Sequence, residues 1–256
     1  MNIYETDKLL AEYLLFHYGT TAEILPPAGQ ALETALSYPV RCVAECVDVA
    51  ALPANSRALD LGCAVGRSTF ELARHCGSAL GIDYSQRFVE AAQAIAAGGA
   101  LAYSRTDEGA LGTPLVARIP SGVPSERVAF EQGDAMELRA DLGPFDVVLM
   151  ANLIDRLREP ERCLARLPSL VKAGGQLVIT SPYTWLEEFT PREHWLGGYE
   201  RDGQRVGTRE GLQRQLAPHF DLVAVKDLPF LIREHARKFQ WSVAEATIWR
   251  RNSAAA

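Results

Sequence analysis

The chain has 256 residues, of which 48% are hydrophobic and 23% are charged, so it can bury a sizeable core and is not disordered overall. This length fits one α/β domain with added segments better than two full domains. Asp and Glu outnumber Lys and Arg by 32 to 26, and the lack of a basic run disfavours a nucleic-acid partner. The first residues do not resemble a signal peptide, and no apolar run approaches the roughly 18 residues of a membrane span, so we expect a soluble, cytoplasmic protein with no membrane partner.

The positions of cysteine and histidine give no sign of a disulfide framework or a metal site. The five cysteines are an odd, scattered set, unlike the even sets of disulfide-stabilised proteins. Cys42 and Cys46 can share one helix face, but no second Cys or His pair with zinc-site spacing accompanies them. We therefore expect the cysteines to be small buried apolar residues and assign no metal.

The predicted elements begin with a helical segment over residues 1–52. Apolar side chains recur at helical spacing over residues 5–18, and Gly19 follows as a stop. A second helix is predicted for residues 39–50. From residue 56 onward the pattern changes to short buried strands.

Strands and helices then alternate, which predicts a mostly parallel sheet with helices on both faces. The last two strands have no helix between them and are predicted to pair antiparallel. The expected architecture is a Rossmann-like α/β fold with seven strands and an antiparallel last strand. The predicted strands are 56–62, 79–83, 127–132, 145–150, 176–180, 220–228 and 241–249, and the predicted helices are 66–76, 85–97, 160–171 and 208–216.

Two segments interrupt this alternation within what we predict to be a single domain, residues 1–256. Residues 100–126 are rich in Gly, Pro and Ser and contain two stretches, 101–105 and 114–119, that can pair as a hairpin. Residues 183–207 are aromatic-rich and too long for a plain connection. We interpret both as insertions near a substrate site.

A glycine turn follows the first predicted strand, in the sequence from Asp60 to Gly66, DLGCAVG. A dinucleotide site would need glycine at positions 64 and 67, where the chain has Ala64 and Arg67. S-adenosylmethionine has no phosphate but carries an ammonium group that Asp60 would favour. The D-x-G-x-x-x-G form resembles motif I of class I S-adenosylmethionine-dependent methyltransferases.

The later landmarks of that superfamily follow in order. Asp83 ends the next strand, where an acid accepts hydrogen bonds from ribose hydroxyls. Asp134 follows the third strand, where the superfamily places an acid beside adenine, and Asn152 follows the fourth, where side chains face the transferred methyl. The resemblance implies S-adenosylmethionine as cofactor and S-adenosylhomocysteine as product. The cofactor-binding residues it implies are Asp60, Gly62, Cys63, Ala64, Gly66, Asp83, Tyr84, Asp134, Ala135 and Asn152.

A closer resemblance covers nearly the whole chain. The segments YETDK (4–8), EYLLFHYG (12–19), YPVRC (38–42) and LDLGCAVGRS (59–68) are similar to the mercaptohistidine N-methyltransferase family. That module often forms the C-terminal part of bifunctional ovothiol synthases and also occurs alone. The resemblance implies methylation of an imidazole nitrogen of 5-thiohistidine to form ovothiol A. It also implies that the sulfoxide synthase and the lyase that supply this substrate are separate proteins.

Two residues after the fourth strand are the catalytic candidates. Asn152 is expected near the acceptor. Asp155 can orient the other ring nitrogen or take a proton, or it can simply cap the following helix. Methyl transfer from a sulfonium is an in-line displacement, so the residues mainly have to align donor and acceptor.

Five further residues are candidates for substrate binding, each with packing as the alternative interpretation. Tyr183 and Trp185 can wall a flat, partly cationic imidazole. Tyr4 and Tyr18 flank the first helix, and in this fold class the segment 1–52 often covers the cofactor as a lid. Arg41 can pair with a carboxylate, either of S-adenosylmethionine or of an amino-acid substrate.

Three alternatives to thiohistidine methylation remain open at the level of the sequence. The same fold can act on another small-molecule imidazole, amine or thiol. A nicotinamide-dependent oxidoreductase is disfavoured by Ala64, Arg67 and the closing strand pair. A protein that binds S-adenosylmethionine without turnover would share all the cofactor landmarks.

Overall fold

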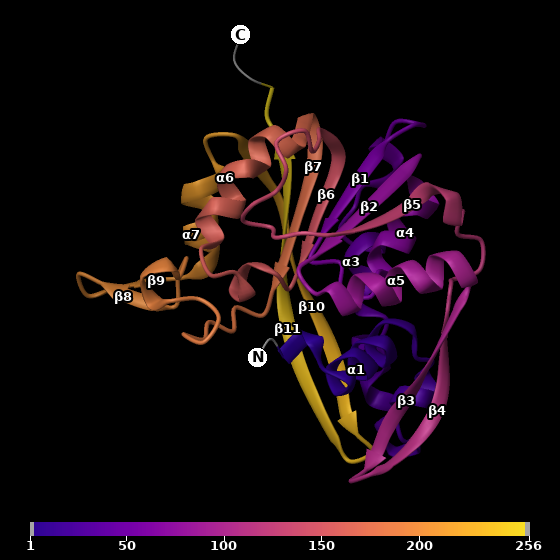
Figure 1. Ribbon diagram of the computed structural model, residues 1–256. Helices are drawn as coiled ribbons and strands as arrows, with labels where there is room; N and C mark the ends of the chain where they lie inside the picture. Colours follow the sequence, from indigo (N-terminus) through magenta and orange to yellow (C-terminus); the bar gives the residue numbers. More distant parts are fainter. Residues whose placement is uncertain (1–2, 254–256) are drawn as a thin grey trace.

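The fold is centred on one seven-stranded sheet, shown in Figure 1 for a computed structural model that describes residues 3–253. The strand order is β10-β11-β7-β6-β1-β2-β5. The pairs from β7 to β5 are parallel, whereas β11 is antiparallel to both β7 and β10. The strands are β1 (Arg57–Leu61), β2 (Ser78–Asp83), β5 (Val128–Gln132), β6 (Phe145–Ala151), β7 (Val171–Ser181), β10 (Phe220–His235) and β11 (Lys238–Arg251). The predicted architecture is confirmed.

Helices cover both faces of this sheet (Figure 1). One layer comprises α3, α4 and α5, and the other comprises α6 and α7. The central strand β6 is buried at its first six positions because both faces are covered. The helices are α3 (Tyr38–Ala44), α4 (Arg67–His75), α5 (Gln86–Gly98), α6 (Pro160–Leu170) and α7 (Thr208–Leu216).

The N-terminal segment begins with a 3-10 turn, Ile3–Glu5, and α1 (Asp7–Tyr18). Thr6 caps α1 by accepting a hydrogen bond from the backbone N–H of Leu9 at 3.3 Å. A short helix, α2 (Thr21–Ile24), and a 3-10 stretch, Pro27–Ala35, lead on to α3.

The second predicted helix is shorter than residues 39–50, because α3 ends at Ala44. Downstream, the backbone N–H and C=O of Asp48 bond the Gln176 side chain at 2.8 and 2.9 Å. These tertiary bonds hold the chain in a 3-10 turn, Val49–Ala51, where local spacing favoured a longer helix.

Two antiparallel hairpins extend beside α1, away from the sheet (Figure 1). One is β3 (Ala100–Glu108) with β4 (Leu111–Arg118), which the sequence predicted as a shorter hairpin. The other is the far half of β10 and β11, which continue well beyond the predicted limits of 228 and 241. A third, small hairpin, β8 (Tyr199–Arg201) with β9 (Gln204–Val206), projects from the segment 183–207.

Arg233 joins the two long hairpins to the N-terminal segment. Its guanidinium donates to the carbonyls of Glu23 and Ile24 at 3.2 and 2.9 Å and to Asp107 of β3 at 3.1 Å. Arg105 donates to the same Glu23 carbonyl and to Asp107. Arg233 is only 7% exposed.

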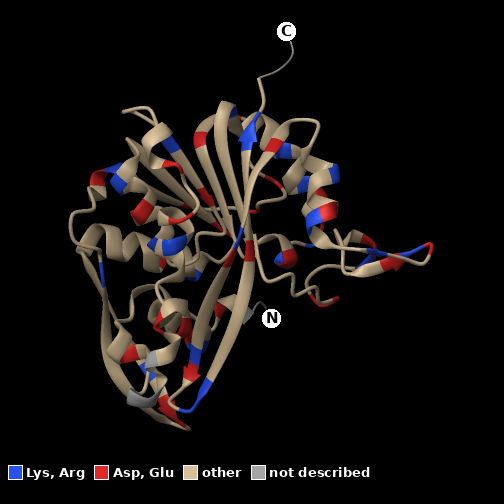
Figure 2. Ribbon diagram, turned by 180° about the vertical axis from the view of Figure 1, so that it is seen from behind, with Lys and Arg blue, Asp and Glu red and all other residues tan. Residues whose placement is uncertain are grey.

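Arg233 does not lie in the turn between the last two strands, because strand pairing continues to His235. Charged residues of both signs do lie at the tip of the β10–β11 ribbon (Figure 2), where Lys238 pairs with Glu234 at 2.7 Å. Among residues 3–253, none of the helices has the length and apolar character needed to cross a membrane.

We expect Arg233→Gln to lower the free energy of unfolding by about 3 kcal/mol, because it removes the buried guanidinium that bonds the Ile24 carbonyl and shares the Glu23 carbonyl and Asp107 with Arg105. Arg237→Gln, at an exposed position four residues away, is the matched control and should change stability by less than about 0.5 kcal/mol. Urea unfolding of both variants checks this. Equal stability of the two variants would contradict the structural role of Arg233.

Candidate active site

A cavity of about 500 Å³ opens at the carboxyl ends of the parallel strands. From β1 the chain builds the sheet first toward β2 and β5 and then, on the other side of β1, toward β6 and β7. The cavity lies at this change of direction, the position at which open α/β sheets bind ligands. The loops after the strands contribute one wall, and the N-terminal segment contributes another. The wall from the loops includes Gly62, Ala64, Asp83, Tyr84, Ser85, Gly133, Asp134, Ala135, Met136, Asn152, Leu153, Arg156, Leu157 and Arg158, and the other includes Tyr4, Tyr13, Phe16, His17, Tyr38 and Pro39.

The glycine turn after β1 brings backbone to the cavity. Gly62 and Gly66 have φ angles of 75° and 87°, and Ala64 between them has 48°, a region that favours glycine. A Cβ on Gly66 would lie 2.6 Å from the Phe130 ring. Gly62 and Ala64 line the cavity, whereas Cys63 and Gly66 lie behind it.

Asp60 lies beneath this turn, outside the cavity lining. Its Oδ2 accepts hydrogen bonds from the hydroxyls of Ser68 and Thr69, both at 2.7 Å, which ties β1 to the first turn of α4. The side chain is fully buried, and burial raises its pKa to about 6. Asp60 therefore shapes the turn, and its Oδ1 has no partner among the described residues.

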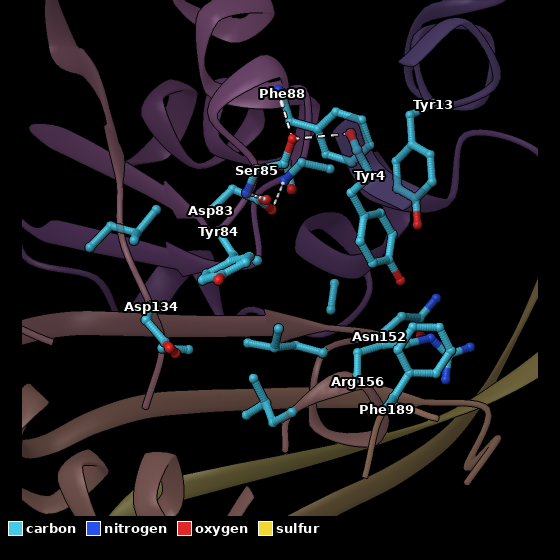
Figure 3. Close-up of a pocket in the computed structure, with 18 of the residues that line it drawn as sticks. Tyr4, Tyr13, Asp83, Tyr84, Ser85, Phe88, Asp134, Asn152, Arg156 and Phe189 are labelled. Atoms are coloured by element: carbon cyan, nitrogen blue, oxygen red, sulfur yellow. Dashed lines mark hydrogen bonds between the residues drawn. The ribbon is translucent and has the colours of Figure 1, made fainter. Parts of the chain in front are cut away.

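Asp83 lines the cavity at the end of β2 (Figure 3). Its Oδ2 accepts from the backbone N–H of Ala64 at 2.8 Å and its Oδ1 from that of Ser85 at 2.9 Å. Burial raises the pKa of this carboxyl to about 6. The two bonds fix the carboxylate while leaving lone pairs for further donors, as a ribose diol requires.

Asp134 lines the same end of the cavity (Figure 3). Its Oδ1 accepts from the Met136 N–H at 2.8 Å, so the loop after β5 holds its carboxylate in place. Ala135 lies beside it in the lining, and Tyr84, 62% exposed, lies at the rim.

Asn152 lies at the other end of the cavity, directly after β6. Its φ is 52°, and its backbone N–H bonds the Thr180 carbonyl at 2.8 Å. The hydroxyl of Tyr38 donates to its Oδ1 at 2.8 Å and lies 2.6 Å from the Thr180 hydroxyl. The side-chain amide is thus oriented by a residue 114 positions earlier in the chain.

Asp155, the second catalytic candidate, does not reach the cavity. It is fully buried and accepts from the Ser181 hydroxyl and the Thr184 N–H, both at 3.0 Å, and from Arg156. It neither caps the following helix α6, whose N-cap is Glu159, nor lines the cavity. Asp155 instead organises the loops after β6 and β7.

Of the five substrate candidates, only Tyr4 lines the cavity. The Tyr183 hydroxyl donates to Glu245 at 2.7 Å. Trp185 stacks on Trp195 and donates to Thr208 at 2.8 Å. Both aromatic rings therefore pack within the segment 183–207 and against the sheet.

The other two candidates also have structural partners. Tyr18 donates to the Val65 carbonyl at 2.7 Å, which links α1 to the glycine turn. Arg41 donates to the carbonyls of Thr34 and Pro229 and pairs with Glu45. A carboxylate bound in the cavity therefore has no contact from Arg41.

The two insertions differ in their relation to the cavity. Residues 183–207 contribute Glu188 and Phe189 to its lining, whereas residues 100–126 contribute none and pack against α1.

Several lining residues were not identified from the sequence. Tyr38 belongs to the YPVRC segment of the family resemblance, so that segment was a usable signal. Arg156 directly follows the candidate Asp155 but carried no motif. His17 also lines the cavity, and burial lowers its pKa to about 3, so it is neutral near pH 7.

These residues fit S-adenosylmethionine. The fixed Asp83 carboxylate suits a ribose diol, Asp134 suits an exocyclic amine, and the acidic surroundings suit a cationic sulfonium and ammonium. Among residues 3–253, no group of three or more His, Cys, Asp or Glu side chains is arranged to hold a metal ion.

Comparison with known proteins agrees with this assignment. Residues 59–179 match the family described as "Methyltransferase domain". The fold is that of class I methyltransferases, and residues 59–179 within it match a methyltransferase domain.

Similar individual proteins are more distant. Norajmaline N-methyltransferase of Rauvolfia serpentina is 28% identical over 124 residues, which is 48% of this chain and 35% of that protein, so the match spans about a third of the relative's length. The [4+2]-cyclase SpnF has a TM-score of 0.58 at 19% identity, covering 96% of this chain and 93% of that one. The N-methyltransferase NodS of Bradyrhizobium japonicum WM9, in complex with S-adenosylhomocysteine, has a TM-score of 0.51 at 15% identity, covering 95% and 99%. At these identities the structures show a shared fold.

We expect S-adenosylhomocysteine to bind more tightly as pH rises through about 6, because Asp83 then ionises and becomes a better acceptor for the ribose hydroxyls. Asp83→Asn should weaken binding at pH 8 by about 10- to 100-fold and flatten this part of the pH dependence. Calorimetric titrations between pH 5 and 8 measure both effects.

Asp227→Asn, at an exposed position on β10, controls for the loss of one negative charge. Asp60 also has a pKa raised to about 6 and is present in all three proteins, although Asp83→Asn removes the nearby charge that contributes to this rise. A pH profile that is the same in Asp83→Asn and the wild type would contradict the role given to Asp83.

Proposed function

We propose that this protein transfers a methyl group from S-adenosylmethionine to an imidazole nitrogen of 5-thiohistidine, forming ovothiol A. The cavity carries this proposal, because it combines an acid-lined cofactor end with an aromatic end beside Asn152. Its volume of about 500 Å³ falls in the roughly 300–1,000 Å³ range of small-molecule sites. The family resemblance of the segments 4–8, 12–19, 38–42 and 59–68 names the acceptor.

The aromatic end suits a small flat acceptor. Tyr4, Tyr13 and Phe189 line it, and Tyr13 packs 4.8 Å, centroid to centroid, from Phe88. Burial raises the pKa of the Tyr4 and Tyr13 hydroxyls above their usual value, so both stay protonated and can donate hydrogen bonds near pH 7. Such walls hold an imidazole ring by its faces and leave its edge free.

S-adenosylmethionine supplies a methyl group on a positively charged sulfur. The residues of this chain align the acceptor and exclude water, which is the main requirement of an in-line displacement. Asn152 is held by Tyr38 and Thr180 and offers a rigid polar contact to the acceptor ring. Choice of nitrogen over the thiolate sulfur then depends on how the walls orient the ring.

Removal of a proton from the acceptor imidazole does not require a strong base in the cavity. His17 is neutral because burial lowers its pKa to about 3, and its Nδ1 has no partner among the described residues. It can accept a hydrogen bond from the acceptor, while its low pKa makes it a weak base near pH 7.

Mass spectrometry of a mixture of 5-thiohistidine, histidine and histidylcysteine sulfoxide, incubated with the protein and S-adenosylmethionine, tests the proposal. We expect one added methyl on thiohistidine alone, located on a ring nitrogen by fragmentation. If S-adenosylmethionine binds but no product forms, the acceptor assignment is wrong. That result would favour either methylation of another acceptor or a protein that uses this fold for a reaction other than methyl transfer.

Asn152→Ala should lower kcat/KM for the methylated acceptor by about 10- to 100-fold, because the cavity loses its fixed polar contact at the acceptor end. Tyr38→Phe should lower it by about 3- to 10-fold, since only the orientation of Asn152 is loosened. Tyr103→Phe, in the β3–β4 hairpin outside the cavity, serves as the control. A larger loss of kcat/KM in Tyr38→Phe than in Asn152→Ala would contradict the idea that Tyr38 acts by orienting Asn152.

A further inference from the structure

The cavity lining holds charged residues of both signs, among them Arg158 and Glu188, and three of the others lie at opposite ends. Asp83 and Asp134 lie at the cofactor end, whereas Arg156 lies with Tyr4 and Phe189 at the opposite end, close to Asn152 (Figure 3). Arg156 ends the 3-10 turn Ile154–Arg156, which directly follows β6. Its side chain is 27% exposed and lines the cavity.

The guanidinium of Arg156 is held in place before any ligand binds. Its Nη1 donates to the Asp155 carbonyl at 3.0 Å, to Asp155 Oδ2 at 3.2 Å and to the Thr184 carbonyl at 2.9 Å. Its central carbon lies 4.9 Å from the centroid of the Phe189 ring. A side chain fixed this firmly loses little further conformational entropy when it binds a ligand.

Beyond its bonds to Asp155 and Thr184, the fixed guanidinium has further N–H donors, which the Tyr4 hydroxyl and a ligand can share. All three bonds to Asp155 and Thr184 leave from Nη1, so they do not use the N–H groups of Nε and Nη2. The Tyr4 hydroxyl lies near enough for charge and hydrogen bonding from Arg156 to act on it. The donors therefore lie near two aromatic side chains, Tyr4 and Phe189.

We propose that Arg156 binds the carboxylate of the acceptor and so makes the enzyme selective for ring-bearing acids over analogues that lack the carboxylate. The planar fork of a guanidinium matches a carboxylate in shape and charge. The flanking rings of Tyr4 and Phe189 suit an acceptor whose flat ring lies a few bonds from its acid group. This inference rests on the proposed function, and it gives Arg156 the contact that the sequence assigned to Arg41.

The test measures binding to the protein saturated with S-adenosylhomocysteine, by calorimetry, so it does not depend on turnover. The ligands are 5-thiohistidine and its decarboxylated analogue, together with imidazole-4-acetate and its amide. The proteins are the wild type, Arg156→Gln, Arg156→Lys and Arg162→Gln. Arg162 lies on the surface of α6, outside the cavity lining, and supplies the matched loss of one charge.

We expect the wild type and Arg162→Gln to bind the acids at least about 10-fold more tightly than the partners that lack the carboxylate. Arg156→Gln should lose this preference, and Arg156→Lys should keep only part of it, because it retains the charge but not the fork. Thermal unfolding of each variant, saturated with S-adenosylhomocysteine, identifies any protein that has not folded. If Arg156→Gln has not folded, the preference for acids measured in Arg156→Lys tests the role of Arg156 instead.

The two proposals fail in different ways. Methylation of thiohistidine without any preference for acids in the wild type overturns the role of Arg156 and leaves the proposed function intact. A preference for imidazole-4-acetate that depends on Arg156, without methylation of thiohistidine, supports the carboxylate site and overturns the thiohistidine assignment. A preference that survives in Arg156→Gln also overturns the role of Arg156.

Discussion

The site depends on one partly buried carboxylate, that of Asp83, which accepts backbone N–H groups from its own loop and from the turn after β1. One bond comes from Ala64 in the turn after β1 and the other from Ser85 at the start of α5. Because Ala64 and Asp83 follow adjacent parallel strands, the bond between them sets the separation of these two strand ends, whereas the local bond from Ser85 holds the start of α5 against the carboxylate. Asp60 acts one layer deeper, where it holds the first turn of α4 against β1. Both carboxyls are buried enough to have raised pKa values, so the geometry of the site is maintained against an electrostatic cost.

The sheet was predictable from the sequence because its signals are local. Short apolar runs separated by helical patterns gave the strands and their parallel order, and the absence of a helix before the last strand gave the antiparallel pair. The glycine turn and the acids after β2 and β5 were predictable for the same reason, since each directly follows a strand. Side-chain direction was not predictable. Asp155 and Tyr183 follow strands too, but Ser181, Thr184 and Glu245 bond them away from the cavity.

Contacts between distant segments account for the remaining differences. Tyr38 orients Asn152 across 114 positions, and Arg233 reaches the carbonyls of Glu23 and Ile24 across more than 200. Nothing in the local pattern around either residue encodes its partner. Arg156 also depends on a distant contact, because its position in the cavity follows from an ion pair with its buried neighbour Asp155 and from the Phe189 ring that an insertion supplies. The acceptor end of the cavity is therefore assembled from tertiary contacts, whereas the cofactor end is assembled from strand ends.

The place of β10 at one end of the strand order has a consequence for self-association. An unpaired edge strand is a template on which another chain can add, and the far half of β10 continues beyond the strands of the main sheet. Pro229 lies in the middle of β10 and has no N–H to offer such a strand, and the charged Lys226 and Asp227 precede it on the exposed edge. Growth of the sheet from one molecule into the next is thus interrupted at this point, although the ribbon itself is long and carries exposed apolar side chains such as Trp241.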